Sequence, residues 1–267
     1  MKRSHWMLAV AVLLVSGHVT GLRADTTCSN ADYRGVYTYF SDGAFQDLPP
    51  QAAVLAGPFA QAGILIPDGQ GNVTLEANAS YNGNIAPLFT EATYSVTPDC
   101  LISFTVPLPP PLVGVVTKFY GVLADHARQT ALMLTEPTVG VLPAQQYKQD
   151  IRFCGLGDFS GSWQIDMGGS IVAPKERAGL FHRIGRLTAD GNGNFSAVSV
   201  ADYNNKFASE DFSGTYTVNA KCFVSLQYKS SSGEDLTIVG PLAGRGEAAL
   251  VMVASPGWAV KGWLRQQ

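Results

Sequence analysis

Two pentapeptides carry oxygen-bearing side chains at alternate positions, as calcium-binding loops do. They are DGQGN, from Asp68 to Asn72, and DGNGN, from Asp190 to Asn194. An EF-hand loop needs a glycine at its sixth position and a carboxylate at its twelfth, and neither copy has either residue there. Since Asp and Asn tolerate turn conformations and glycine supplies positive φ, we interpret both as hairpin loops, with a weak surface calcium site as the alternative.

Few residues could act as acids, bases or metal ligands. His126 lies with Asp125 and Arg128 in a predicted hairpin turn, and His182 lies alone on a predicted strand, where a histidine is more often structural than catalytic. The sequence lacks G-x-S-x-G, H-E-x-x-H and a phosphate-binding glycine loop. We therefore predict no catalytic residue, no metal ligand and no cofactor, and leave enzymatic activity open with a non-catalytic role favoured.

Aromatic side chains offer an apolar binding surface instead. The first copy contains Tyr37, Tyr39, Phe59, Tyr81 and Tyr94, and the second copy mirrors this set with Trp163, Phe181, Tyr203 and Tyr216. Aromatic residues bury large areas, so these could fill a core or line a cavity. The candidate ligand-binding residues, for a small and largely apolar ligand, are Tyr37, Phe59, Tyr94, Trp163, Phe181, His182 and Tyr216.

The chain contains an internal duplication. Residues 56–100 align with residues 178–222 without a gap, and 17 of the 45 pairs are identical. Because the period exceeds that of any solenoid repeat, each copy should be a self-contained domain. We predict a signal peptide over residues 1–24, one β-barrel module over 25–150 and a second over 151–267.

Each module carries one pair of cysteines at matching places. An exported chain meets an oxidising compartment, and the four cysteines contain no C-x-x-C motif that would suggest zinc. We therefore predict one disulfide per module, pairing Cys28 with Cys100 and Cys154 with Cys222.

The second copy shows eight short segments with apolar residues at alternate positions, the period of a half-buried strand. Eight antiparallel strands can close into a barrel that is either filled or holds one small ligand. The fold class is therefore all-β, with two tandem antiparallel eight-stranded barrels. The predicted strands are 159–165, 180–188, 194–200, 214–218, 222–228, 236–239, 248–254 and 258–265.

The first residues predict export. Lys2 and Arg3 precede an apolar run that is too short to span a bilayer, and a stretch of small and polar residues follows, with cleavage expected between Gly21 and Ala24. Removing the leader leaves 15 basic residues against 21 acidic ones. A nucleic-acid partner is excluded on this charge balance, and no later segment is apolar enough for a membrane helix. We expect a periplasmic or extracellular protein whose protein partners, if any, are undefined.

Two resemblances support this architecture. The string from Gly185 to Cys222 resembles a module of exported bacterial proteins of uncharacterised function, found singly or in tandem. Gly161-Ser162-Trp163, with Arg265 on the last strand, resembles calycin barrels such as lipocalins, in which a G-x-W tryptophan packs under a terminal arginine. The first copy departs from this pattern, with Tyr37 for the tryptophan and Lys148 as the nearest counterpart of the arginine.

Three functions follow from this reading. The first is binding of a small apolar ligand in one or both barrels. The second is catalysis by shape, as the resemblance to cyclase and dirigent barrels implies, which needs few titratable groups. The third is a structural or adhesive role, with filled barrels that present an exposed apolar patch.

Overall fold

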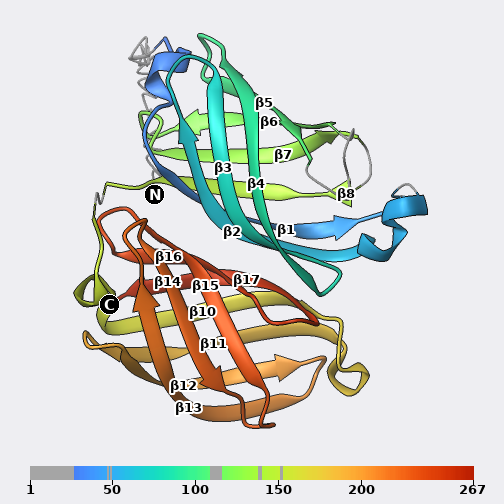
Figure 1. The fold of residues 1–267 in the computed structure, drawn as a ribbon, viewed down its shortest axis with the longest axis vertical. Coiled ribbons are helices and arrows are strands. Elements are labelled where there is room, and N and C mark those ends of the chain that lie inside the picture. Colours follow the sequence, from blue (N-terminus) through green and yellow to red (C-terminus); the bar gives the residue numbers. More distant parts are fainter. Residues whose placement is uncertain (1–26, 47, 49, 109–115, 138–139, 151–152) are drawn as a thin grey trace, which may run out of the picture.

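Two closed antiparallel barrels, packed side by side, make up nearly all of the structure (Figure 1). The computed structural model describes residues 27–267 except 47, 49, 109–115, 138–139 and 151–152. The predicted signal peptide lies outside the described residues, and the predicted module boundary adjoins residues 151–152 and stays a prediction. The predicted fold class is confirmed, because each barrel closes with eight antiparallel strands.

The first barrel closes through pairing of its first two strands, and the two-residue strand β8 (Gly140–Val141) adds to β1 outside the closed set. Around the barrel the strands run in the order β2 to β7, then β9 and β1. They are β1 (Tyr37–Phe45), β2 (Gly57–Pro67), β3 (Asn72–Tyr81), β4 (Asn84–Val96), β5 (Leu101–Pro107), β6 (Val116–Ala124), β7 (Gln129–Glu136) and β9 (Pro143–Lys148).

In the second barrel every strand pairs with the next, and β10 closes against β17. This is an up-and-down barrel, which leaves no open sheet edge. Its strands are β10 (Ser160–Ile171), β11 (Gly179–Asp190), β12 (Asn194–Tyr203), β13 (Phe207–Val218), β14 (Phe223–Lys229), β15 (Asp235–Ala243), β16 (Ala248–Val253) and β17 (Trp258–Gln266). All eight predicted strands are present, and β10 and β13 are longer than predicted.

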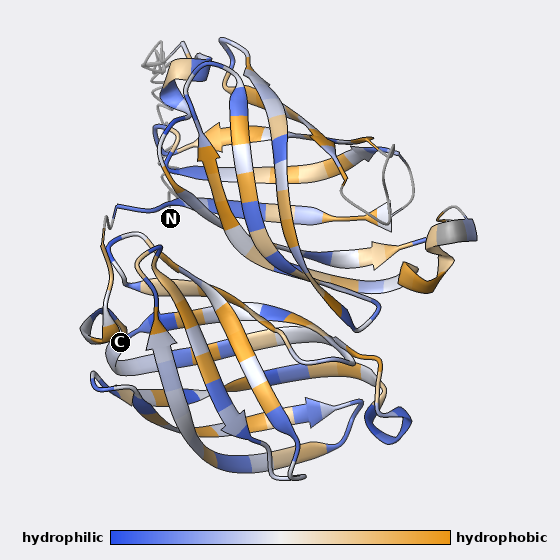
Figure 2. Cartoon of the chain, in the orientation of Figure 1, coloured by the Kyte–Doolittle hydropathy of each residue, from blue (hydrophilic) through white to orange (hydrophobic). Residues whose placement is uncertain are grey.

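Burial alternates along most strands, as a barrel with one wet face requires. In β12, Phe195 and Ala197 are buried, while Ser196 between them and Val198 after them are exposed. Figure 2 shows the same alternation as orange and blue bands along the strands. The alternation is lost in β2 and β16, where both faces are buried. Those strands lie between the barrels, so their outer faces are covered as well.

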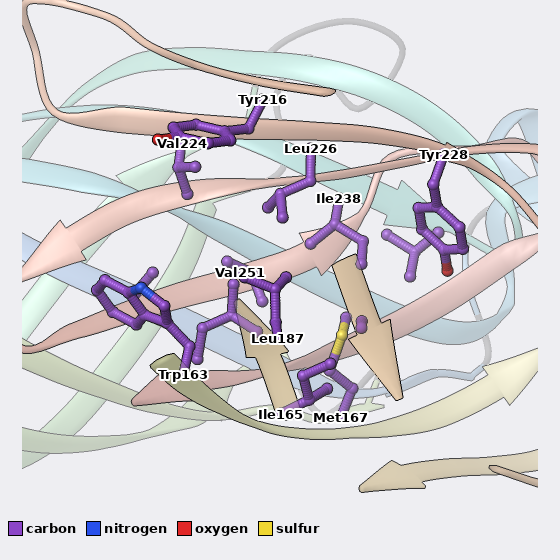
Figure 3. Close-up of a cluster of buried hydrophobic side chains, with 14 of the residues drawn as sticks. Trp163, Ile165, Met167, Leu187, Tyr216, Val224, Leu226, Tyr228, Ile238 and Val251 are labelled. Atoms are coloured by element: carbon purple, nitrogen blue, oxygen red, sulfur yellow. The ribbon is translucent and has the colours of Figure 1, made fainter. Parts of the chain in front are cut away.

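The second barrel is filled by its own side chains (Figure 3). Trp163 is fully buried, stacks on Phe159 at a ring-centroid distance of 4.4 Å, and donates its indole N–H to the carbonyl of Ser160. Tyr216 packs edge-on against Phe159 at 5.2 Å, and aliphatic residues such as Leu226 and Val251 fill the layers beyond. These side chains fill the interior of the second barrel, beginning at the end that contains Trp163 and Phe159.

The calycin-like pairing of Trp163 with Arg265 is wrong. Arg265 lies on the outer face of β17, where its guanidinium stacks over the ring of Trp263 at 4.5 Å. The reason is register, since Trp163 pairs with Gln266 and the alternation turns Arg265 outward. In the first barrel Lys148 Nζ does lie 5.9 Å from the ring centroid of Tyr37.

The two pentapeptides form hairpin loops, as predicted. Asp190 Oδ1 accepts hydrogen bonds from the backbone N–H groups of Asn192 and Asn194 at 2.7 and 2.9 Å, and both intervening glycines have positive φ. Asp68 makes the same contacts in the first barrel, where the side chain of Asn72 also donates to it at 2.8 Å. These hydrogen bonds lower the pKa of Asp68 to about 2, with the side chain of Asn72 as the largest cause.

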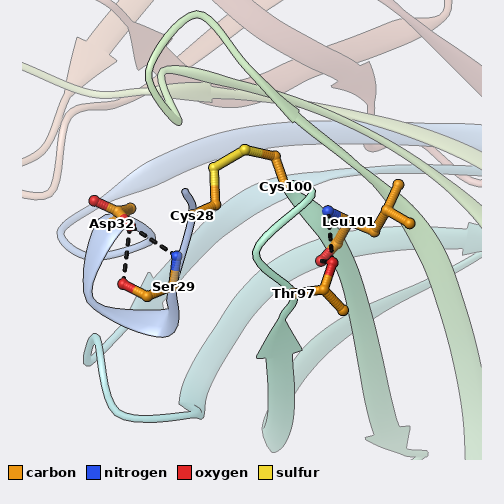
Figure 4. The surroundings of a disulfide bond; sticks show 6 residues. All are labelled: Cys28, Ser29, Asp32, Thr97, Cys100 and Leu101. Carbon is orange, nitrogen blue, oxygen red and sulfur yellow. Dashed lines mark hydrogen bonds between the residues drawn. A yellow bond between two sulfur atoms is a disulfide. The ribbon is translucent and has the colours of Figure 1, made fainter. Parts of the chain in front are cut away.

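Both predicted disulfides are confirmed, one in each barrel. In the first, Cys28 joins the turn at Cys100, between β4 and β5, and it precedes a short 3-10 helix capped by Ser29 and Asp32 (Figure 4). The closed loops span 72 and 68 residues. In the chain-entropy model each is worth about 4 kcal/mol. The disulfides indicate an oxidising environment.

An apolar interface joins the barrels. Phe40, Ala62 and Ile85 of the first barrel pack against Leu250 and Met252 of the second. The ring of Trp263 meets Phe40 and Tyr147 edge-on at 5.1 and 4.8 Å. Backbone atoms touch as well, since the N–H of Gly257 donates to the carbonyl of Gly83 at 2.8 Å and a Cβ on Gly83 would lie 2.9 Å from Gly257 Cα.

Two buried hydrogen bonds and one exposed ion pair also join the barrels. Ser80 donates its hydroxyl to the carbonyl of Trp258 at 2.5 Å, and the Gln149 side-chain amide donates to the carbonyl of Leu242 at 2.9 Å. Lys221 and Glu76 form an ion pair of 2.6 Å between the barrels. With this packing, the two barrels form one body.

Candidate functional site

A cavity of about 70 Å³ lies inside the first barrel. It is large enough for several water-sized groups. Its lining is mostly aromatic and aliphatic, and no described lining residue is charged. The lining includes Tyr39, Phe45, Phe59, Gln61, Leu65, Leu75, Tyr81, Leu88, Phe104, Val106, Phe119, Leu132 and Gln146.

One end of the cavity is closed by an aromatic layer. Tyr33 packs against Tyr37, Tyr94 and Phe104, with ring centroids 4.5 to 5.7 Å apart. The hydroxyls in this layer are all used: Tyr33 donates to Gln146 Oε1 at 2.5 Å, Tyr37 to the carbonyl of Ala127 at 2.5 Å, and Tyr94 to the carbonyl of Tyr33 at 2.8 Å. This layer is therefore a satisfied core that defines the floor of the cavity.

The other end is covered by an apolar segment. The 3-10 helix η2 (Pro50–Leu55) connects β1 to β2, and its Ala52 and Leu55 are buried against Leu48, Tyr81 and Leu108. No charged side chain takes part in this described cluster. Among the described residues, a ligand that entered here would meet the apolar side chains of this cluster and the ring of Tyr81.

Two buried hydrogen-bond donors in the cavity lining have no partner. The hydroxyl of Tyr39 and the side-chain amide Nε2 of Gln61 make no hydrogen bond to any described residue, although the residues are only 3% and 7% exposed. Leaving a buried polar group unpaired costs about 1–3 kcal/mol. Tyr39 and Gln61 are therefore candidate contact residues for a molecule in the cavity.

The strand register places these donors together. Gln61 on β2 pairs with Ser41 on β1, and Tyr39 points inward two residues earlier, opposite Gly63. Gly63 has no side chain to occupy the interior beside the tyrosine ring. The hydroxyl of Ser41 is directed elsewhere, donating to the carbonyl of Pro143 at 2.8 Å. Tyr39 and Gln61 are thus diagonal neighbours on adjacent strands, and both line the cavity.

Burial keeps the tyrosines of the cavity lining in their neutral form. Burial raises the pKa of Tyr39 well above its usual value, with a smaller effect from Tyr81. Burial likewise raises the pKa of Tyr81 to about 12. Tyr39 therefore keeps its proton at physiological pH and can donate it in a hydrogen bond to an acceptor oxygen.

The second barrel holds a buried polar cluster at the equivalent place. By the gapless alignment Gln61, Tyr81 and Leu88 correspond to Arg183, Tyr203 and Glu210. The same offset, continued into β5 and β14, pairs Val106 with Tyr228. In the second barrel Arg183 and Glu210 form an ion pair with side chains 3% and 6% exposed. We call Arg183, Glu210, Tyr203 and Tyr228 the polar plug.

Hydrogen bonds and rings surround the plug. Arg183 donates to the hydroxyls of Tyr228 and Tyr203 at 2.7 and 3.2 Å, and Tyr203 donates to Glu210 at 2.9 Å. The guanidinium also lies 5.1 Å from the ring centroid of Phe212. The plug occupies the space that stays empty in the first barrel, because each replacement is larger. Arg183 is longer than Gln61, Glu210 is longer than Leu88, and Tyr228 is bulkier than Val106.

The seven candidate ligand-binding residues are divided among four places. Phe59 lines the cavity. Tyr37 and Tyr94 belong to its aromatic floor, and Trp163, Phe181 and Tyr216 belong to the core of the second barrel. His182 lies on the outer face of β11, with a side chain 57% exposed and its Nε2 3.0 Å from Asp166 Oδ1.

Sequence reasoning missed Gln61, and the duplication contained the signal for it. Gln61 and Arg183 stand between the identical pairs Phe59/Phe181 and Gly63/Gly185, at an inward-facing position where the copies differ in charge. The other candidate clusters are surface features. His126 Nδ1 lies 4.0 Å from Asp125 Oδ1, and both side chains are largely exposed. Among the described residues no group of three His, Cys, Asp or Glu could hold a metal ion.

Comparisons with known proteins give no family. No protein-family model matches the sequence, and no curated protein matches it. Among solved structures, a protein of unknown function from the DUF3598 family of Nostoc punctiforme is similar, with 11% identity over 89% of this chain and 97% of that chain and a TM-score of 0.23. No described helix has the length and apolar character to cross a membrane.

Proposed function

We propose that the first barrel binds a small, neutral, largely apolar molecule that carries a hydrogen-bond acceptor oxygen such as a carbonyl. The observation that carries this proposal is the pair of unpartnered donors, Tyr39 and Gln61, in an apolar cavity. An acceptor oxygen between them would satisfy both donors, while apolar parts of the ligand would contact the leucine and phenylalanine side chains.

The chemistry of the lining argues for a neutral ligand. Transferring an isolated carboxylate into an apolar interior is far more costly than transferring a carbonyl, unless a cation pairs with it. The described lining offers two neutral donors and no cation. The second barrel shows what a charge at this place requires, since Arg183 is held by Glu210 and two tyrosines.

The role is that of a carrier or sensor outside the cytoplasm. The two disulfides and the predicted leader support export, and fractionation of cells that express the full chain tests it. The processed protein should begin near Asp25 and be found in the periplasm or the medium. Recovery of an unprocessed chain from the cytoplasm would contradict export without affecting the cavity.

A pair of isosteric probes tests the ligand class. Acetone and isobutene have four heavy atoms each and nearly the same shape, so both suit a cavity of about 70 Å³, but only acetone has a carbonyl. Methyl NMR of the leucines that line the cavity should show both binding, with acetone about 2- to 10-fold tighter, the range that one net hydrogen bond provides. If neither probe perturbs these methyl groups, the cavity does not take ligands of this kind.

Variants of the two donors separate shape from hydrogen bonding. Tyr39→Phe combined with Gln61→Leu should remove the preference for acetone and leave isobutene binding unchanged. Tyr37→Phe is the matched control, because its hydroxyl is used within the floor of the cavity and should not affect the preference. An unchanged preference in the double variant would refute the assigned role of Tyr39 and Gln61.

A further inference from the structure

Because of the duplication, each outer face of one barrel has a counterpart on the other barrel. Inside the chain, one face of the first barrel packs against a different face of the second. The first barrel contributes the outer face of β1 to β4, and the second contributes the outer face of β15 to β17. At the centre of this contact, the cross-strand neighbours Ala62 and Asn78 lie on one side and Val239 and Met252 on the other. Ala62 and Met252 are fully buried there.

The counterpart of each face on the other barrel is exposed and apolar. Ala62 and Asn78 correspond to Ile184 and Val200, which are also cross-strand neighbours and are 52% and 46% exposed. Leu180, Val198 and Phe207 add to this surface, with 73%, 50% and 77% exposure. We call these five residues the β11–β12 face.

The second counterpart lies on the first barrel. Val239 and Met252 correspond to Tyr120 and Met133, again cross-strand neighbours, which are 49% and 55% exposed. Val122 extends the surface at 43% exposure. We call Tyr120, Val122 and Met133 the β6–β7 face. In a soluble chain large apolar residues that gather on one face mark an interaction surface rather than scattered surface residues.

From this pattern we infer that the chain associates head to tail with a second copy of itself, the β11–β12 face of one copy docking on the β6–β7 face of the next. Inside the chain the corresponding faces pack against each other, and Ile85, the counterpart of Phe207, takes part in that contact. The same contact, repeated between chains, would pair the two faces that the chain leaves uncovered. Because the two faces differ, the interface is heterologous, and further copies can add until a ring closes or a filament forms.

The geometry of a barrel favours side-chain docking over strand exchange. Both barrels are closed, and among the described strands only the two-residue β8 is paired on one side alone, too short to seat another strand. Association must therefore rest on the outer side chains. His182, which pairs with Asp166, lies between Leu180 and Ile184 on β11, and Arg186 lies opposite Val198, so the β11–β12 face also contributes polar contacts to the interface.

Sedimentation velocity of the mature chain over a range of concentrations tests the inference. The wild type should show oligomers that grow with concentration. Val200→Lys on one face and Met133→Lys on the other should each weaken self-association at least about tenfold, since each places an ammonium group in the apolar centre of the contact. Both positions are about half exposed, so the fold should tolerate the lysine, and Ser213→Lys, on an exposed part of β13, is the matched control that should associate like the wild type.

Mixing the two lysine variants identifies the type of interface. An equimolar mixture should form dimers and stop there, because each variant retains one intact face and the two intact faces are complementary. If Val200→Lys is monomeric while Met133→Lys still dimerises, the contact joins two identical faces and the head-to-tail inference is wrong. A wild type that stays monomeric at all concentrations would also overturn it.

Discussion

Replacing Glu210 with glutamine should destabilise the second barrel by about 3–5 kcal/mol, the cost of leaving a buried charge without its partner. Glu210 and Arg183 pair with side chains only 6% and 3% exposed, so water cannot replace the lost carboxylate. Tyr203 and Tyr228 cannot compensate as anions. Burial raises the pKa of both hydroxyls, that of Tyr203 to about 12, and each stays neutral.

A second variant separates the cost of an unpaired charge from the cost of lost packing. Arg183→Met combined with Glu210→Leu removes both charges and keeps most of the apolar volume. Buried ion pairs replaced in this way are often neutral or more stable by about 1–4 kcal/mol. The double variant should therefore be more stable than Glu210→Gln alone, although it loses the contact of the guanidinium with the ring of Phe212.

Urea denaturation followed by tryptophan fluorescence is the assay. Trp163, Trp258 and Trp263 all belong to the second barrel, and the fourth tryptophan lies in the predicted leader. Asp235→Asn is the control, because its ion pair with Lys229 is exposed and should contribute less than about 1 kcal/mol. A loss of less than about 1 kcal/mol in Glu210→Gln, or a double variant no more stable than the single one, would refute the reasoning.

Two further predictions concern the first barrel. Tyr39→Phe should raise the free energy of unfolding by about 1 kcal/mol in urea denaturation without ligand, because it removes an unpartnered buried hydroxyl. Tyr37→Phe should lower the free energy of unfolding by about 1–3 kcal/mol, because it leaves the carbonyl of Ala127 unpaired. A loss of stability in both variants would contradict the prediction for Tyr39. Carbon-detected NMR titration should give Asp68 a pKa of about 2, and Asn72→Ala should raise it. Since the folded-state pKa is depressed, the stabilisation by this loop is present above about pH 4 and is lost as the pH falls through 2; an Asp68 that titrates near 4 would contradict this.

The fold was largely predictable because its signals are local or repeated. Alternation of apolar residues marks the strands, the pentapeptides mark two hairpins, and the matching cysteines allow one pairing within each module. Strand β13 was predicted from Gly214, but it begins at Phe207. Its first half contains Glu210, whose inward carboxylate breaks the apolar alternation and is acceptable there only because Arg183 neutralises it. A single-strand pattern cannot show that compensation.

The site was less predictable, because the same aromatic residue types occur in a filled core and in the wall of a cavity. Tyr37 and Tyr39 are two residues apart and both point inward, yet one completes the floor and the other offers a free hydroxyl. The difference lies in whether an acceptor is within reach, which depends on distant strands. The sequence alone could not show whether His182 points into the barrel or outward. Its direction depends on the strand register, in which it pairs with Asp202 on β12 and Gly168 on β10.

The cavity also makes the two barrels unequal under hydrostatic pressure. Unfolding under pressure is driven by the internal void volume that it eliminates. The second barrel has side chains of the polar plug where the first has empty space, so compression should act first on the half of the chain with the cavity. The same void would be reduced by any molecule that fills it, so an occupied first barrel should resist pressure as the second barrel does without a ligand.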